Sequence, residues 1–127
     1  MKRLALLLIA LFAIFGISQA HAPQEPTREK LWTKADSKAY ARDRLAIWYD
    51  KQYLCLSQLW DKESRWNPKA YNRVKVMGKN AGGIPQLLGM SPSTPPTQQI
   101  ERGLSYIYYR YTTPCKALAY HKKHGWY

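Results

Sequence analysis

The chain has 127 residues and a formal net charge of +12, with 20 Lys and Arg against 8 Asp and Glu. This length allows one domain and excludes a multidomain enzyme. A hydrophobic content of 46% is too high for a disordered chain, and 8 Pro with 7 Gly are too few for a low-complexity or collagen-like protein. We expect a small folded domain whose ligands are polyanions, such as nucleic acid, anionic lipid or an acidic cell-wall polymer.

Residues 1–20 are typical of a secretory signal peptide. A basic start precedes an apolar run of 14 residues, from Leu4 to Ile17, and small residues follow where a signal peptidase cuts. The run is shorter than the roughly 20 residues that span a bilayer as a helix, which disfavours the alternative of a membrane anchor. We predict cleavage after Ala20 or Ala22, no stable membrane span afterwards, and an exported protein.

Residues 21–50 are predicted to form a polar linker followed by a helical lead-in. Residues 22–28 contain two prolines and no periodic apolar pattern. From about Leu31 to Tyr49 helix-forming residues dominate, with a weak apolar stripe. The stripe consists of Trp32, Ala35, Ala39, Leu45 and Trp48.

A stronger helical pattern follows and is expected to end near Trp66, because Pro68 biases the preceding residue away from helical geometry. Four residues at positions i, i+3, i+4 and i+7 share one face of this helix. They are Leu56, Leu59, Trp60 and Glu63. The spacing therefore places Glu63 on an apolar face.

Residues 67–96 contain nine Pro and Gly, which predicts a loop-rich insertion with room for a very short hairpin around Val74 to Ile84. A third helix is predicted after it, opened either by Thr94 with Pro95 or by Thr97. Its apolar face consists of Ile100, Gly103, Leu104, Ile107, Tyr108 and Tyr111.

A last short helix is predicted after Thr113, which can cap it, with Pro114 at its first position and Gly125 just after its end. Together these patterns predict a mainly α domain.

Two cysteines, Cys55 and Cys115, remain after the signal peptide. In an oxidising compartment a disulfide is the simplest expectation, and two free buried thiols are the alternative. The histidines do not combine with the cysteines in a metal-ligand spacing. We predict no metal and no cofactor.

Glu63 is the candidate catalytic residue. A carboxyl on the apolar side of a helix loses hydration, which penalises its charged form and raises its pKa. Such a group suits general acid catalysis near neutral pH, which the cleavage of a glycosidic bond requires. The alternative is that Glu63 is the solvent-exposed polar end of an amphipathic helix.

Four segments, in order along residues 52–127, resemble the lytic transglycosylase family. Residues 59–70 are similar to its catalytic segment, in which Glu-Ser ends a helix and Asn-Pro-x-Ala follows. Residues 83–86 resemble its second motif, a Gly-containing turn that ends in Gln, and residues 99–107 resemble its helix behind the site. Residues 117–127 are similar to the ending of the short, secreted, disulfide-bonded branch, which also carries Cys at the places of Cys55 and Cys115.

The resemblance implies a lysozyme-like helical domain over residues 51–127, similar to soluble lytic transglycosylases and goose-type lysozymes. It implies that Glu63 is the sole catalytic acid/base and that Ser64, Gln86 and Tyr120 line a saccharide groove. In such enzymes one carboxyl protonates the oxygen that links N-acetylmuramic acid to N-acetylglucosamine. It then accepts the proton of the muramoyl C6 hydroxyl as that oxygen closes on C1, which leaves a 1,6-anhydro sugar.

The carboxylate count favours this single-carboxyl mechanism. Hydrolysis by the usual routes needs a second carboxylate about 5 to 9.5 Å from the first. From Gln52 onward the only other carboxylates are Asp61 and Glu101. Asp61 is expected on roughly the opposite side of its helix, and Glu101 in the first turn of the next helix, where carboxylates commonly interact with the helix dipole.

The sequence departs from the family pattern at two places. Gly82 stands where a bulky residue, commonly Tyr, precedes the Gly of the second motif, and this should loosen that wall of the groove. The hydroxyl residue often found upstream is missing from residues 77–80. Both departures bear on substrate affinity rather than on the class of reaction.

The expected partner is therefore the glycan strand of peptidoglycan, bound by a monomer. Four cations after the catalytic segment could border the groove or be solvated surface residues, namely Lys69, Arg73, Lys75 and Lys79. Two alternatives remain open: a lysozyme-like hydrolase of the same bond and a non-catalytic, secreted, cationic peptidoglycan-binding protein. A nucleic-acid binder fits the charge, but export and a disulfide argue against it.

Overall fold

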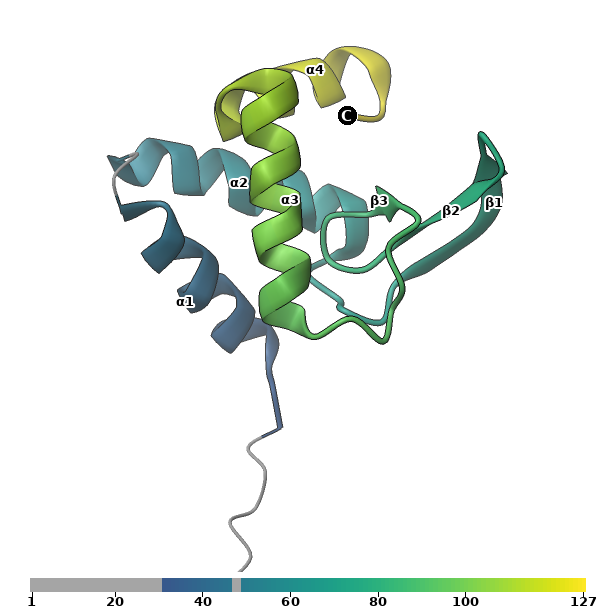
Figure 1. Cartoon of the computed structure of the whole chain (residues 1–127). Coiled ribbons are helices and arrows are strands. Elements are labelled where there is room, and N and C mark those ends of the chain that lie inside the picture. The colour runs from purple at the N-terminus through teal and green to yellow at the C-terminus, as the bar shows by residue number, and fades with distance from the viewer. Residues whose placement is uncertain (1–30, 47–48) are drawn as a thin grey trace, which may run out of the picture.

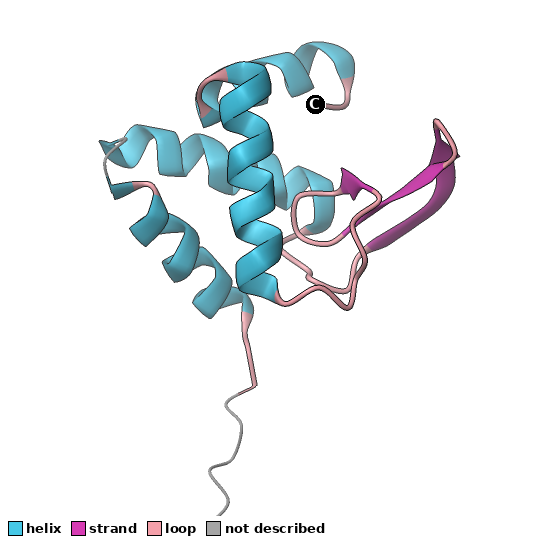
Figure 2. Ribbon diagram, in the orientation of Figure 1, coloured by secondary structure: helices cyan, strands magenta, loops and turns pink. Residues whose placement is uncertain are grey.

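The computed structural model describes residues 31–46 and 49–127. The predicted signal peptide, both of its cleavage positions and Trp48 lie outside the described residues. The described chain forms four helices and a small antiparallel sheet that projects from one side of them (Figures 1 and 2). The prediction of a mainly α domain is therefore confirmed. Within the described ranges, no helix combines the length and apolar character needed to cross a membrane.

Helix α1 (Lys34–Arg44) begins with a capping box. The Thr33 hydroxyl accepts a hydrogen bond from the Asp36 backbone N–H at 3.1 Å, and the Asp36 carboxylate accepts one from the Thr33 backbone N–H at 2.9 Å. These bonds satisfy backbone donors that the first turn leaves without helical partners.

The predicted apolar stripe of the lead-in is correct only for Leu45 among the described residues. Ala35 and Ala39 are exposed, whereas Ser37, Ala41 and Leu45 are buried. Trp32 precedes the helix and is partly exposed, and its indole N–H donates to the Ser37 hydroxyl at 2.7 Å. The buried side of this helix instead follows Ser37, Ala41 and Leu45, at positions i, i+4 and i+8, and of these only Leu45 belongs to the predicted stripe.

Helix α2 (Tyr49–Ser64) buries the predicted face, with Leu56, Leu59 and Trp60 fully inaccessible to solvent. It ends two residues before the predicted boundary, because Arg65 and Trp66 both adopt positive φ angles, 54° and 62°. This sharp exit folds the Trp66 ring back into the core, where it lies 5.1 Å from the Trp60 ring in an edge-to-face arrangement.

The sheet contains strands β1 (Tyr71–Val76), β2 (Lys79–Gly82) and β3 (Leu87–Leu88), in that order. The antiparallel β1–β2 pair is the predicted short hairpin. Strand β3 was not predicted, since two residues are too few to produce a periodic pattern. Its pairing with Ala81 and Gly82 turns the chain back toward the helices.

Helix α3 (Pro96–Tyr111) starts differently from both expectations. Neither Thr94 nor Thr97 caps it; Pro95 holds the N-cap position without a side-chain hydrogen bond, and Pro96 is the first helical residue. A proline is suited to that position because it lacks the N–H that would remain unpaired there and its fixed φ is helical.

Helix α4 (Pro114–His124) agrees with its prediction. The Thr113 hydroxyl accepts from the Lys116 backbone N–H, and Gly125 ends the helix with a left-handed φ of 78°. The four helices share one core, to which α1 contributes Ala41 and its C-cap residue Leu45. The lead-in helix thus packs with the region that we had placed in the catalytic domain.

The predicted disulfide is present between Cys55 of α2 and Cys115 of α4. It joins residues 60 positions apart in the sequence, and the Cys115 backbone N–H also donates to the Gln52 side chain at 3.0 Å. The disulfide therefore ties the middle of α2 to the first turn of α4.

We expect the double variant C55S/C115S to lose about 4 kcal/mol of unfolding free energy, because a closed loop of this length restricts the unfolded chain. Urea titrations of both proteins would measure the difference. Equal midpoints and slopes would show that the disulfide adds nothing to stability.

Candidate active site

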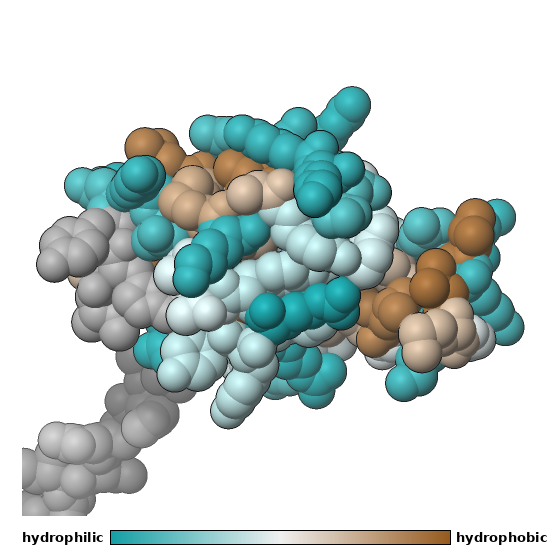
Figure 3. Space-filling model, turned by 90° about the horizontal axis from the view of Figure 1, so that it is seen from above, coloured by the Kyte–Doolittle hydropathy of each residue, from teal (hydrophilic) through white to brown (hydrophobic). Residues whose placement is uncertain are grey.

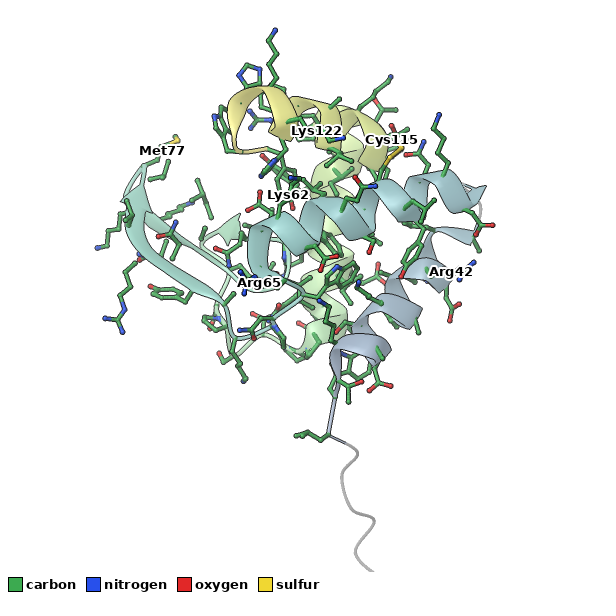
Figure 4. The ribbon with its side chains drawn as sticks, turned by 180° about the vertical axis from the view of Figure 1, so that it is seen from behind. Arg42, Lys62, Arg65, Met77, Cys115 and Lys122 are labelled. Atoms are coloured by element: carbon green, nitrogen blue, oxygen red, sulfur yellow. A yellow bond between two sulfur atoms is a disulfide. The ribbon has the colours of Figure 1, made fainter. Side chains whose placement is uncertain are left out.

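Glu63 lies in the last turn of α2, where this helix reaches α4 and the turn formed by residues 83–86. Its side chain is only 16% exposed. Figure 4 shows this end of α2, with Lys62 and Arg65 labelled, between α4 and the hairpin that carries Met77.

His121 of α4 is a polar partner of the Glu63 carboxyl. Its Nε2 lies 2.9 Å from Glu63 Oε1, and its side chain is 14% exposed. This pair was not predicted, because the spacing of the histidines was considered only for metal binding. The signal was available: His121 lies four residues after Ala117 and three after Leu118, both buried, so it shares their side of α4.

Burial raises the pKa of Glu63 to about 7, from an ordinary value of 4.5. The pKa of His121 is lowered, first by burial and then by the positive charge of Lys62. Burial therefore favours the uncharged form of both groups, a neutral imidazole beside a protonated carboxyl. A carboxyl in this state can act as a general acid.

Tyr127 is a buried neighbour of Glu63. Its hydroxyl accepts a hydrogen bond from the Trp60 indole N–H at 2.9 Å and donates to the Pro85 carbonyl at 2.8 Å. Burial, and then the charge of Glu63, raise the pKa of Tyr127 well above its ordinary value. Tyr127 is therefore a neutral phenol that is fixed at both hydrogen-bonding positions.

The 83–86 turn is held by hydrogen bonds from several distant segments. Ser64 donates to the Ile84 carbonyl at 2.6 Å, and Tyr127 binds the next carbonyl. The Gly83 backbone N–H donates to the Ala70 carbonyl at 2.8 Å. These bonds fix the turn against the end of α2, directly beside Glu63.

Gln99 is fully buried and completes the support of the turn. Its side-chain oxygen accepts from the Ile84 backbone N–H at 2.8 Å, and its amide donates to the carbonyls of Pro68 and Thr94 at 3.0 and 2.8 Å. One side chain thus joins α3 to three loop segments. The sequence placed Gln99 in the helix behind the site but gave it no such role.

Gly103 explains the interruption in the apolar face of α3. A Cβ at this position would lie 2.6 Å from the Trp60 ring and 2.8 Å from Pro85 Cβ. Only glycine allows α3 to approach the end of α2 and the turn this closely.

The expectation that Gly82 loosens one wall of a groove is wrong. A Cβ at position 82 would lie 2.1 Å from the Met90 carbonyl oxygen, so the backbone after β3 already occupies that space. Gly82 is buried and paired with Leu87. The glycine is required by strand β3, which the sequence did not reveal.

The other predicted site residues lie in three different settings. The Ser64 hydroxyl donates to the Ile84 carbonyl of the 83–86 turn, as described above. Gln86, with a φ of 52°, turns its amide back onto the Gly83 carbonyl at 3.0 Å. Tyr120 precedes His121 but lies among aromatic rings, with the His124 ring at 4.1 Å and the Trp126 ring at 5.1 Å. The roles proposed for them in saccharide binding stay predictions.

The two other carboxylates considered from the sequence have partners elsewhere. Asp61 pairs with Lys34 and Lys38 of α1, at 3.0 and 3.5 Å. Glu101 pairs with Arg44 and accepts a hydrogen bond from the Tyr40 hydroxyl at 2.8 Å. Both link α1 to other helices, so Glu63 is the carboxyl with an environment suited to proton transfer.

The raised pKa of Glu63 predicts a pH dependence of folding stability. Because the folded protein favours the protonated carboxyl, the stability is complete below pH 4.5 and falls as the pH rises through about 7. Between these pH values we expect the unfolding free energy of the unaltered protein to fall by up to about 3 kcal/mol more than that of Glu63→Gln. Urea titrations of both proteins from about pH 4 to about pH 8 would test this, and parallel stability curves would contradict it.

Within residues 31–46 and 49–127, no three His, Cys, Asp or Glu side chains gather as a metal site requires.

Comparisons of the chain with protein-family models, with curated proteins and with solved structures find no match.

Proposed function

We propose that this protein cleaves the β-1,4 bond between N-acetylmuramic acid and N-acetylglucosamine in peptidoglycan, as an exported lytic transglycosylase with a lysozyme-like helical domain. The observation that carries the proposal is the buried carboxyl of Glu63, with a pKa of about 7, at the end of a helix and beside an uncharged imidazole. The four segments that resemble the family support the choice of substrate.

In the proposed reaction, protonated Glu63 donates its proton to the oxygen of the scissile bond. The bond between that oxygen and C1 of the muramoyl residue breaks, and the N-acetylglucosamine end leaves as an alcohol. The resulting carboxylate then accepts the proton of the C6 hydroxyl while that oxygen bonds to C1. The proton count balances, and no water molecule is consumed.

The surroundings of Glu63 fit this sequence of steps. Burial keeps the carboxyl protonated for the first step. His121 offers a neutral hydrogen-bonding nitrogen that orients the carboxyl, and we assign it a positioning role. Tyr127 and Ser64 hold the neighbouring turn, and Ser64, Gln86 and Tyr120 remain the proposed saccharide contacts.

Purified sacculi incubated with the exported protein would test this function. We expect soluble muropeptides whose new ends carry the muramoyl residue, as identified by mass spectrometry. Sacculi that bind the protein but stay intact would instead support the non-catalytic binding module. Products cut at a peptide or amide bond would contradict the proposal.

A further inference from the structure

The hairpin made of β1, β2 and their turn carries apolar side chains that face solvent. Met77 at the turn is 90% exposed, and Val74 on β1 is 70% exposed. The exposed large apolar residues of the sheet are Tyr71, Val74, Val76, Met77 and Leu88. Figure 1 shows the hairpin extending away from the helices, so its turn lies at the edge of the molecule.

The strand register collects several of these residues on one face. Val76 is opposite Lys79, and Leu88 is opposite Ala81. Because side chains alternate along a strand, Val76 and Lys79 share a face with Ala81 and Leu88, whereas the register is irregular between Tyr71 and Lys75. Figure 3 shows apolar atoms over the hairpin at the right of the view, on the side of the molecule seen from α4.

The same region is strongly cationic. Between Ser64 and Ile100 the sequence contains no Asp or Glu but five cations, which are Arg65, Lys69, Arg73, Lys75 and Lys79. None of the five forms an ion pair with another described residue. Their charge is therefore available to an anionic partner.

Apolar residues at an exposed turn, flanked by lysines, match the interface of an anionic bilayer. There, apolar side chains enter the boundary between head groups and acyl chains, and long cationic side chains reach the phosphates. A second copy of this chain would bring two surfaces of like charge together, which disfavours self-association through the hairpin.

We propose that the hairpin binds the surface of an anionic phospholipid bilayer, with Val76 and Met77 inserted and with Arg73, Lys75 and Lys79 on the lipid phosphates. The protein would then work at the membrane-proximal side of its substrate. This binding does not depend on the proposed cleavage, so Glu63→Gln is expected to bind as the unaltered protein does.

Co-sedimentation with phosphatidylglycerol vesicles, and with phosphatidylcholine vesicles as the neutral reference, would test the charge requirement. The experiment uses the exported protein, whose N-terminus is first determined by mass spectrometry. Every variant is made with that same N-terminus. We expect R73Q/K75Q/K79Q to bind phosphatidylglycerol vesicles about 100-fold more weakly, from about fivefold for each cation. The matched variant K116Q/K122Q/K123Q removes the same charge from exposed positions of α4 and should lose much less.

A second pair of variants tests the apolar contribution. V74T/V76T/M77T should weaken vesicle binding at least tenfold, whereas L54T/Y109T removes exposed apolar side chains from α2 and α3 and should not. Hydrogen exchange of the unaltered protein should show protection of residues 71–82 only when phosphatidylglycerol vesicles are present.

Three results would overturn the proposal. In the first, the protein binds sacculi but does not bind phosphatidylglycerol vesicles. Another is equal binding to neutral vesicles. The third is equal loss of binding in the hairpin and control variants, with protection outside the hairpin.

Discussion

Glu63→Gln is expected to lower the rate of muropeptide release from sacculi on the order of 1,000-fold. General acid–base catalysis by a positioned side chain commonly contributes about 100- to 10,000-fold, and in the proposed reaction one group performs both proton transfers. An amide of nearly the same shape cannot donate or accept that proton. The substitution removes a buried ionisable group, so the fold should be retained and even stabilised above pH 7.

Asp61→Asn and Glu101→Gln are the matched controls, because each replaces a carboxyl by its amide in the same domain. Both carboxylates pair with cations of α1 on the protein surface, and such pairs contribute about 0 to 1 kcal/mol. Their cleavage rates should stay within a few-fold of the unaltered protein. Equal losses in all three variants would remove the special role of Glu63.

The pH profile of cleavage follows from the same group. The rate should fall as the pH rises above about 7, because Glu63 then loses the proton that the first step requires. Initial rates of cleavage of soluble glycan fragments, measured below and above this pH, would show the decrease. A rate that keeps rising with pH would contradict a carboxyl as the acid.

The largest expected loss of stability comes from Gln99→Leu. This change has similar volume but leaves the buried Ile84 N–H and the carbonyls of Pro68 and Thr94 without their partner. Each such group costs about 1–3 kcal/mol, so we expect a loss of about 5 kcal/mol in unfolding free energy. Urea or thermal unfolding, with the disulfide intact, would measure it.

Gln98→Leu is the control for this effect, because Gln98 is the exposed neighbour in the same helix turn. We expect it to change the unfolding free energy by less than about 0.5 kcal/mol. If both variants unfolded at the same denaturant concentration, the three hydrogen bonds of Gln99 could not be what holds the loops to α3.

Features set by local sequence were predictable. Thr113, Pro114 and Gly125 mark the ends of α4 because capping depends on residues within one turn. The buried face of α2 followed from periodicity, and with it the burial of Glu63, since a helix fixes which side chains lie on one side. The disulfide needed no geometry, because the chain has only two cysteines.

Features set by contacts between distant segments were not predictable. Periodicity tells which side of a helix is buried but not which element covers it, so the pairing of His121 with Glu63 stayed hidden. The bond from Tyr127 to Pro85 joins residues 42 positions apart, and the bond from Gln99 to Pro68 spans 31. Strand β3 exists only through pairing with β2, and for that reason the requirement for Gly82 was also missed.

Digestion of sacculi in heavy-oxygen water would test the proposed cleavage of the glycan strand by a single carboxyl without water. We expect 1,6-anhydromuramoyl ends without the label, and their absence from digests with Glu63→Gln. Reducing ends that carry one heavy oxygen would contradict it, because they would show that water attacks C1 and that the protein is a hydrolase.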